Sequence, residues 1–333
     1  MKDRTPIRLI MFKINDMNPN LLMAIVFLLF GWASCGGQTR GAPGNTGFQR
    51  VPVPEANPFP SIRAIPVPAG YQRVVEAKLS FAEWLRGVAL KKNRMVYLYN
   101  GEPKHNQQAQ FAVLDISTGN KDLQQCADAV MRLRAEYLYS LGDPGRIDFH
   151  TVGGASLNFG EWAAGKRWRL AGGRLVGYTT GAVIRRAAAG SEEPGLSGQA
   201  RAAGSVRIDQ ALATVYKDRK CFDEYLETVF SWCSTLSLEK ELNRVERFSG
   251  MQIGDVFIKG GSPGHAMLVV DMAEDRAGHK LYMLAQGYMP AQDIHIVKNP
   301  SEPGLSPWYR LEEGPVDTPE WTFYPGQLRS WRQ

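Results

Sequence analysis

The sequence predicts an α+β domain in which helices pack on an antiparallel sheet. Three short apolar runs separated by turns fill residues 254–286, a pattern typical of an antiparallel meander. Apolar residues at i, i+3 and i+4 spacing predict two long helices, at about residues 120–141 and 221–232. The chain has 333 residues, 44% of them hydrophobic, which suffices for a sizeable core. We therefore expect a single folded domain over residues 71–333.

The N-terminus has the pattern of an export signal. Basic residues precede the apolar run 21–30, which suits a signal-peptide core and is too short to span a bilayer. The small residues that follow, and then Cys35, resemble a bacterial lipoprotein signal. That resemblance implies that residues 1–34 are removed, that Cys35 is lipidated, and that the chain is a membrane-anchored envelope protein. Trp32 departs from the usual pattern, so a plain secretory peptide and an uncleaved anchor are the alternatives.

Two segments have the composition of loops. Residues 35–70 are rich in Pro and Gly and predict a partly extended tether between the lipid anchor and the domain. Residues 185–206 are rich in Ala, Gly and Ser and predict a flexible, exposed insert.

The elements of the domain follow from local patterns. Ser80 with Glu83 three residues later predicts a capped helix, and Asn120 is the expected cap of the helix 120–141. The remaining expected elements are strands at 95–99, 111–116 and 294–297 and helices at 161–168 and 237–247.

The meander suggests a catalytic base. If its second and third strands pair around a turn near residues 275–276, His265 lies opposite Gln286 on the same face of the sheet. An imidazole beside a side-chain amide is held in one tautomer and orientation, as a general base requires. The alternative is a purely structural histidine.

Cys126 is the first candidate for a nucleophile. It lies near the start of the helix 120–141, where the helix dipole favours a thiolate. A cysteine on an apolar helical stripe is also commonly a small core residue, and this interpretation stays open for Cys126. Cys221, at the start of its helix, is the second candidate, and Cys233 is expected to be core. Three cysteines after Cys35 are an odd number, which argues against a full disulfide framework.

The order Cys126, His265, Gln286 resembles that of the papain-like cysteine hydrolases. The pair Gly254-Asp255, followed by Gly264-His265, is similar to the cell-wall endopeptidases and amidases of that class. The resemblance implies that Cys126 attacks a carbonyl, that His265 takes and returns the proton, and that Gln286 orients His265. It also implies an amide donor to the oxyanion, for which Gln124 and Gln125 are the candidates. The substrates would be amide bonds in peptidoglycan or other peptides.

Four blocks resemble a family of bacterial lipoproteins known as domain of unknown function 4846. These blocks are DLQQCADAVMRLRAEYLY (122–139), GDVFIKGGSPGHAMLVVD (254–271), LAQGYMPAQDIHI (284–296) and TPEW (318–321). The resemblance spans about residues 71–328 and implies no activity. The insert 185–206 lies outside these blocks.

Other classes of function have weaker support. A formal charge of +6, evenly spread, argues against nucleic-acid binding. His265, Asp271 and either His279 or His295 are possible metal ligands, but no ligand spacing supports a metal site, and we expect no cofactor. A tryptophan-lined groove would make the chain a non-catalytic envelope lipoprotein that binds glycan or peptide. Its candidate residues are Trp162, Trp168, Trp308 and Trp321.

Overall fold

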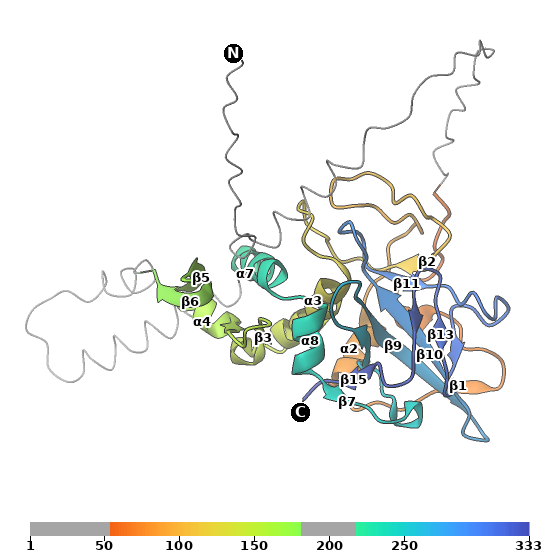
Figure 1. Ribbon diagram of the computed structural model, residues 1–333. Coiled ribbons are helices and arrows are strands. Elements are labelled where there is room, and N and C mark those ends of the chain that lie inside the picture. The colour runs from red at the N-terminus through yellow and green to blue at the C-terminus, as the bar shows by residue number, and fades with distance from the viewer. Residues whose placement is uncertain (1–53, 181–217, 333) are drawn as a thin grey trace, which may run out of the picture. The chain divides into compact units, whose positions relative to one another are not determined.

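The protein is described by a computed structural model that covers residues 54–180 and 218–332. Cys35, the signal segment and the insert 185–206 lie outside the described residues. In the described part, nine strands form one main sheet, and every pair of neighbouring strands is antiparallel (Figure 1). Helices pack against this sheet, so the prediction of an α+β fold is confirmed.

Seven strands of the main sheet form a continuous row. In spatial order they are β2 (Gln110–Val113), β11 (His295–Val297), β10 (Lys280–Gln286), β9 (His265–Asp275), β8 (Val256–Lys259), β15 (Leu328–Ser330) and β7 (Asn243–Arg244). Two further strands pair at the side, β1 (Tyr71–Arg73) with β9 and β12 (Tyr309–Arg310) with β10. The expected strand 95–99 forms only isolated bridges.

The meander β8–β9–β10 is present as predicted, but its register differs from the expected one. Ala285 pairs with Leu268, and the register shifts at a bulge between Met283 and Leu284. This register places Gln286 beside Met267, two residues beyond His265. The two side chains are therefore diagonal neighbours on one face, which long side chains still bridge.

Helix α3 (Cys126–Ser140) packs on β9 and begins later than the sequence suggested. Its cap is Gln125, whose backbone N–H donates to Asp128 Oδ2 (3.1 Å), so Asn120 is not the cap. The reciprocal bonds of this capping box satisfy the first backbone donors of the helix and fix its start. Cys126 is thus the first helical residue.

Helices α2 (Phe81–Gly87) and α8 (Thr235–Glu241) also contact the sheet. The expected cap of α2 is confirmed, because Ser80 Oγ accepts from the Glu83 backbone N–H at 3.1 Å. Helix α8 ends six residues before the predicted end at 247, and the chain then enters β7.

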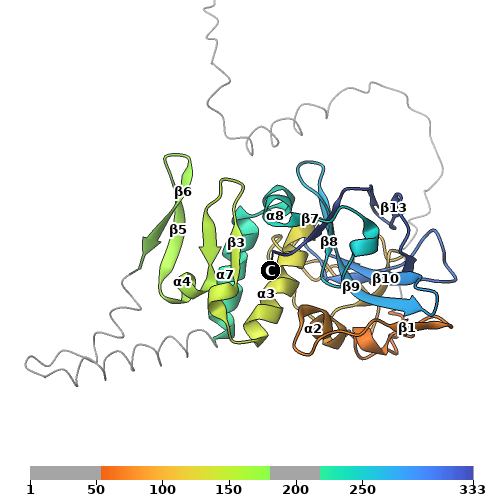
Figure 2. The same cartoon turned by 90° about the horizontal axis from the view of Figure 1, so that it is seen from below.

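Helix α7 (Arg219–Trp232) packs on α3 and on α4 (Phe159–Ala163) (Figure 2). The expected helix 161–168 is wrong beyond Ala163, because Trp168 lies in a β-hairpin, where it pairs with Gly177. The hairpins of this region are β3 (Asp148–His150) with β4 (Ser156–Asn158), and β5 (Lys166–Ala171) with β6 (Arg174–Thr179). A further pair, β13 (Val316–Asp317) with β14 (Thr322–Phe323), lies near the C-terminus.

Residues 54–70 belong to the folded body, although their composition predicted part of a tether. Ile62 and Ile65 are buried in the core. Asp271 on β9 anchors the N-terminal elements, since its carboxylate pairs with Arg73 Nε (2.7 Å) and Arg86 Nε (2.6 Å). No helix in the described ranges is long and apolar enough to cross a membrane.

Candidate active site

Cys126 lies at the amino end of α3, the position at which a helix best stabilises an anion. The side chain is buried, with 8% of its surface exposed. Burial raises the pKa of the thiol to about 11, as does the nearby Asp128 charge. Hydrogen bonds from the backbone N–H groups of Ala127, Ala266 and Cys126 itself partly oppose this rise in pKa. Ala266 directly follows His265, so the sulfur lies beside the first residues of β9.

His265 is the first residue of β9 and is 2% exposed. Its Nε2 lies 2.8 Å from Gln286 Oε1, which is the imidazole–amide contact that the sequence suggested. Its other nitrogen, Nδ1, has no hydrogen-bond partner among the described residues. Tyr288 and Trp321 flank the ring, with ring centroids 5.0 and 5.2 Å from that of the imidazole. These ring contacts contribute to the burial of His265.

Cys126 and His265 line the same cavity, of about 410 Å³. Helix α3, the start of α8, the glycine-rich loop 260–264 and the loop after β10 form its walls. A larger cavity, of about 680 Å³, lies between α2, α3 and α7, and it contains neither residue. We take the smaller cavity as the candidate site because Cys126 and His265 both line it.

Burial favours the neutral forms of the Cys126 thiol and the His265 imidazole. Desolvation lowers the pKa of His265 to about 4; the hydrogen bond to Gln286 and the Glu320 charge oppose that shift in pKa, and Lys104 adds to it. With a thiol pKa of about 11, neither group is charged at pH 7 when considered by itself.

Two glycines allow the walls of the site to approach each other. A Cβ on Gly287 would lie 2.8 Å from Gln125 O and 2.9 Å from Ala129 Cβ, so this residue lets the strand end contact the start of α3. A Cβ on Gly264 would lie 2.6 Å from Thr235 Oγ1. Both positions thus tolerate only glycine without movement of the walls.

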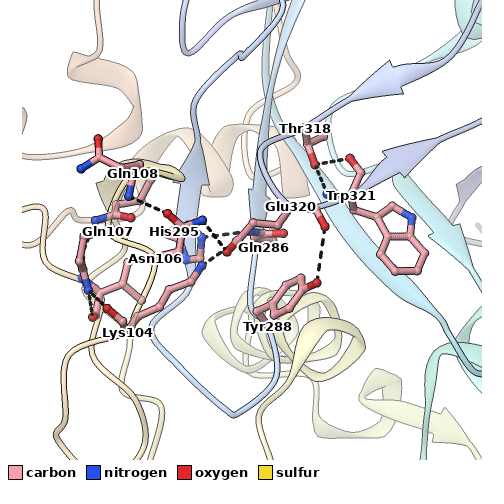
Figure 3. A network of polar contacts seen from close by, with 12 residues as sticks. Lys104, Asn106, Gln107, Gln108, Gln286, Tyr288, His295, Thr318, Glu320 and Trp321 are labelled. Carbon is pink, nitrogen blue, oxygen red and sulfur yellow. Dashed lines mark hydrogen bonds and ion pairs between the residues drawn. The ribbon is translucent and has the colours of Figure 1, made fainter. Parts of the chain in front are cut away.

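A polar network surrounds the Gln286 amide and includes Glu320, His295 and Lys104 (Figure 3). Gln286 Nε2 lies 2.8 Å from Glu320 Oε2 and 3.1 Å from His295 Nε2. Glu320 pairs with Lys104 Nζ at 2.6 Å, and Lys104 is 7% exposed. Burial lowers the pKa of Lys104, while its hydrogen bond to Glu320 and the Glu320 charge raise it. Lys104 and Glu320 were not predicted as site residues from the sequence, although Glu320 lies in the TPEW block.

Neither candidate amide for the oxyanion is well placed. Gln125 lines the cavity, but its Nε2 lies 3.2 Å from Asp122 Oδ1. Gln124 Nε2 has no partner among the described residues, yet Gln124 is not part of the cavity wall. Backbone N–H groups at the start of α3 are the nearer donors.

The other sequence candidates lie elsewhere or have structural partners. Cys233 lines the cavity, but its thiol donates to His150 O (3.4 Å) and burial raises its pKa. Cys221 is half-buried, and it is not among the residues that line this cavity.

The proposed metal ligands do not form a site. Asp271 is paired with two arginines, and His279 is an exposed partner of Asp275. No group of three His, Cys, Asp or Glu side chains suited to a metal occurs in the described ranges.

The four tryptophans do not form one groove. Trp308 is buried in the core, and its Nε1 donates to Pro66 O (2.9 Å). Trp162 is buried and stacks on Trp168, with centroids 6.1 Å apart. Trp321 alone lies at the Cys126 cavity.

The fold and this site define an α+β protein in which a buried cysteine and a buried histidine line one cavity, and a glutamine contacts the histidine. The chain belongs to the family described as domain of unknown function 4846, because the family model matches residues 62–185 and 201–330. The unmatched residues 186–200 fall within the alanine- and glycine-rich insert. No curated protein and no solved structure matches the chain.

Proposed function

We propose that the protein is a papain-like thiol hydrolase that cleaves amide bonds, with Cys126 as nucleophile, His265 as base and Gln286 as orienting residue. One observation carries the proposal: His265 is held through Nε2 by Gln286, and the cavity that it lines also contains the thiol at the start of α3. A base held by a third group and placed beside a nucleophile is the general signature of nucleophilic catalysis.

The arrangement supports a two-step reaction. Cys126 Sγ attacks the amide carbon while its proton moves to His265 Nδ1, and the resulting imidazolium then protonates the leaving amine. Water next attacks the thioester, His265 accepts a proton from the water, and that proton returns to the released thiol. Backbone N–H groups near Sγ supply donors for the oxyanion.

The low exposure of the pair has a chemical consequence. A neutral thiol and a neutral imidazole resist ionisation separately, but proton transfer between them creates two opposite charges that stabilise each other. Mutual attraction of the two charges lowers the free-energy cost of forming the thiolate, and reaction at neutral pH depends on that attraction.

The location of this activity is part of the proposal. The N-terminal pattern supports export and a lipid anchor at Cys35, which would place the domain in a bacterial cell envelope. In the cell envelope, the peptide bridges of peptidoglycan contain amide bonds that could be the substrates. The anchor is tested by incorporation of labelled palmitate, which we expect in the wild type and not in Cys35→Ala; equal incorporation in both would contradict it.

The hydrolase activity is tested with isolated peptidoglycan peptides and released amines as the readout. We expect the wild type to release amines, Cys126→Ala to release none, and Cys233→Ala to act like the wild type. Cys233→Ala is the matched control because Cys233 lines the same cavity. Amine release by Cys126→Ala would refute the proposal. That result would favour the alternative, a non-catalytic envelope protein that binds glycan or peptide.

A further inference from the structure

Glu320 constrains the orientation of the Gln286 amide. Its Oε2 lies 2.6 Å from Lys104 Nζ and 2.8 Å from Gln286 Nε2. A carboxylate paired with an ammonium group only accepts hydrogen bonds. The group of Gln286 that faces Glu320 must therefore be its NH₂, because an oxygen there would face another oxygen without a proton between them.

His295 constrains the same amide from a second direction. Its Nδ1 lies 2.9 Å from the backbone carbonyl of Asp293, which only accepts, so Nδ1 carries the proton. Burial lowers the pKa of His295 to about 3, so the ring is neutral and Nε2 is an acceptor. That Nε2 lies 3.1 Å from Gln286 Nε2. Both hydrogens of the Gln286 NH₂ group thus have acceptors.

The orientation of the amide determines the tautomer of His265. With its NH₂ directed at Glu320 and His295, Gln286 presents Oε1 to His265 Nε2 at 2.8 Å. This oxygen only accepts, so His265 Nε2 must carry the proton. Because the pKa of His265 is lowered to about 4, the ring is neutral and Nδ1 retains its lone pair.

We propose that Glu320, paired with Lys104, is a positioning residue that fixes the Gln286 amide and thereby keeps His265 Nδ1 unprotonated. Its role as a positioning residue rests on the proposed hydrolase function, since Nδ1 is then the atom that accepts the thiol proton. Glu320 is not among the residues that line the cavity. Its carboxylate contacts the Gln286 amide directly, and its charge also raises the pKa of His265.

The first test measures the tautomers directly in the wild-type protein. Long-range ¹H–¹⁵N correlation spectra at pH 7, assigned with His265→Ala and His295→Gln, report which ring nitrogen carries the proton. We expect opposite tautomers on the two sides of Gln286, with His265 protonated at Nε2 and His295 at Nδ1. A His265 ring protonated at Nδ1 would overturn the inference.

The second test removes the constraint. The double variant Lys104→Met/Glu320→Met removes the ion pair without leaving an unpaired buried charge, which buried pairs commonly tolerate. We expect its Cys126 alkylation rate at pH 7 to fall tenfold or more, because a charge-assisted hydrogen bond to the amide is lost, and a second His265 tautomer to become visible.

Asn106→Ala is the matched control for the double variant. It removes the 3.1 Å bond to the other carboxylate oxygen, Oε1, and leaves Oε2 in place. We expect a change of less than twofold. An unchanged alkylation rate and spectrum in Lys104→Met/Glu320→Met would show that Glu320 does not position the amide.

The two proposals fail separately. If the two histidines have opposite tautomers but native Cys126 is not alkylated at pH 7, the positioning role of Glu320 is supported and the hydrolase proposal is refuted. If Cys126 is alkylated rapidly and this depends on His265, but His265 is protonated at Nδ1, the hydrolase proposal is supported and the positioning role of Glu320 is refuted.

Discussion

His265 and His295 lie on either side of the Gln286 amide, each buried and each with a lowered pKa. They differ in the use of their second nitrogen. His295 Nδ1 is bonded to the Asp293 carbonyl, whereas His265 Nδ1 has no partner among the described residues and its ring lines the cavity of Cys126. Burial and pKa alone therefore do not separate a catalytic histidine from a structural one; the partner of each nitrogen does.

The largest expected effect separates the two histidines by reactivity. We expect His265→Ala to slow alkylation of Cys126 at pH 7 by about 10²- to 10⁴-fold, the range that a general base supplies. We expect His295→Gln to slow it less than tenfold, because Glu320 still orients Gln286. The measurement is the rate of carbamidomethylation at Cys126 by mass spectrometry. An equal decrease of the alkylation rate in the two variants would show that His265 and His295 do not differ in their effect on Cys126.

A smaller effect is expected where the two walls of the site meet. Gly287→Ala places a Cβ within 2.9 Å of Ala129 Cβ, and we expect this to lower the free energy of unfolding by roughly 1–3 kcal/mol. Gly304→Ala is the control, since nothing lies within 4 Å of its added Cβ. Denaturant unfolding measures both variants. Equal stability of Gly287→Ala and the wild type would contradict the close approach of α3 and β10.

A further expected effect, of similar size, is one in which the two histidines behave alike. Each folded-state pKa lies below the unfolded value of 6.5, so the unfolded chain binds protons first as the pH falls. The stability that each neutral ring contributes is therefore complete above pH 6.5 and is lost as the pH falls toward 4 for His265 and toward 3 for His295.

Urea unfolding at pH 7 and pH 5 measures this loss. Each histidine should account for roughly 2 kcal/mol of it. We expect His265→Ala and His295→Gln to reduce the acid loss equally. A variant with the same loss as the wild type would show that its histidine is already charged at neutral pH or is exposed.

The sequence predicted the parts of the site that local patterns determine. Periodicity located the meander and the helix of Cys126, and the alternation of side chains placed His265 and Gln286 on one face. It missed the register by two residues, because the bulge at Met283 and the longer turn after Asp275 depend on tertiary packing. It also began α3 too early, because the Gln125 capping box has no Ser or Thr to mark it.

The residues around Gln286 were beyond prediction from the sequence alone. Glu320 is 34 residues from Gln286 and 216 from Lys104, and both contacts depend on loops that the sheet brings together. The one available signal was the position of Glu320 in the TPEW block. The expected helix 161–168 was wrong beyond Ala163 for a related reason: pairing of β5 with β6 decided the structure around Trp168, and helical propensity did not.

The central claim, that Cys126 and His265 act as one proton-sharing pair, is tested most directly by the pH profile of Cys126 alkylation in the wild type. A thiol with a pKa of about 11 acting alone reacts tenfold faster with each pH unit up to pH 11, with about 10⁻⁴ of it ionised at pH 7. A proton-sharing pair instead gives a rate plateau through neutral pH, since its thiolate–imidazolium form has the same net charge as its neutral form. We predict this plateau in the wild type and its loss in His265→Ala. A rate that climbs steadily toward pH 11 in both proteins would contradict the pair.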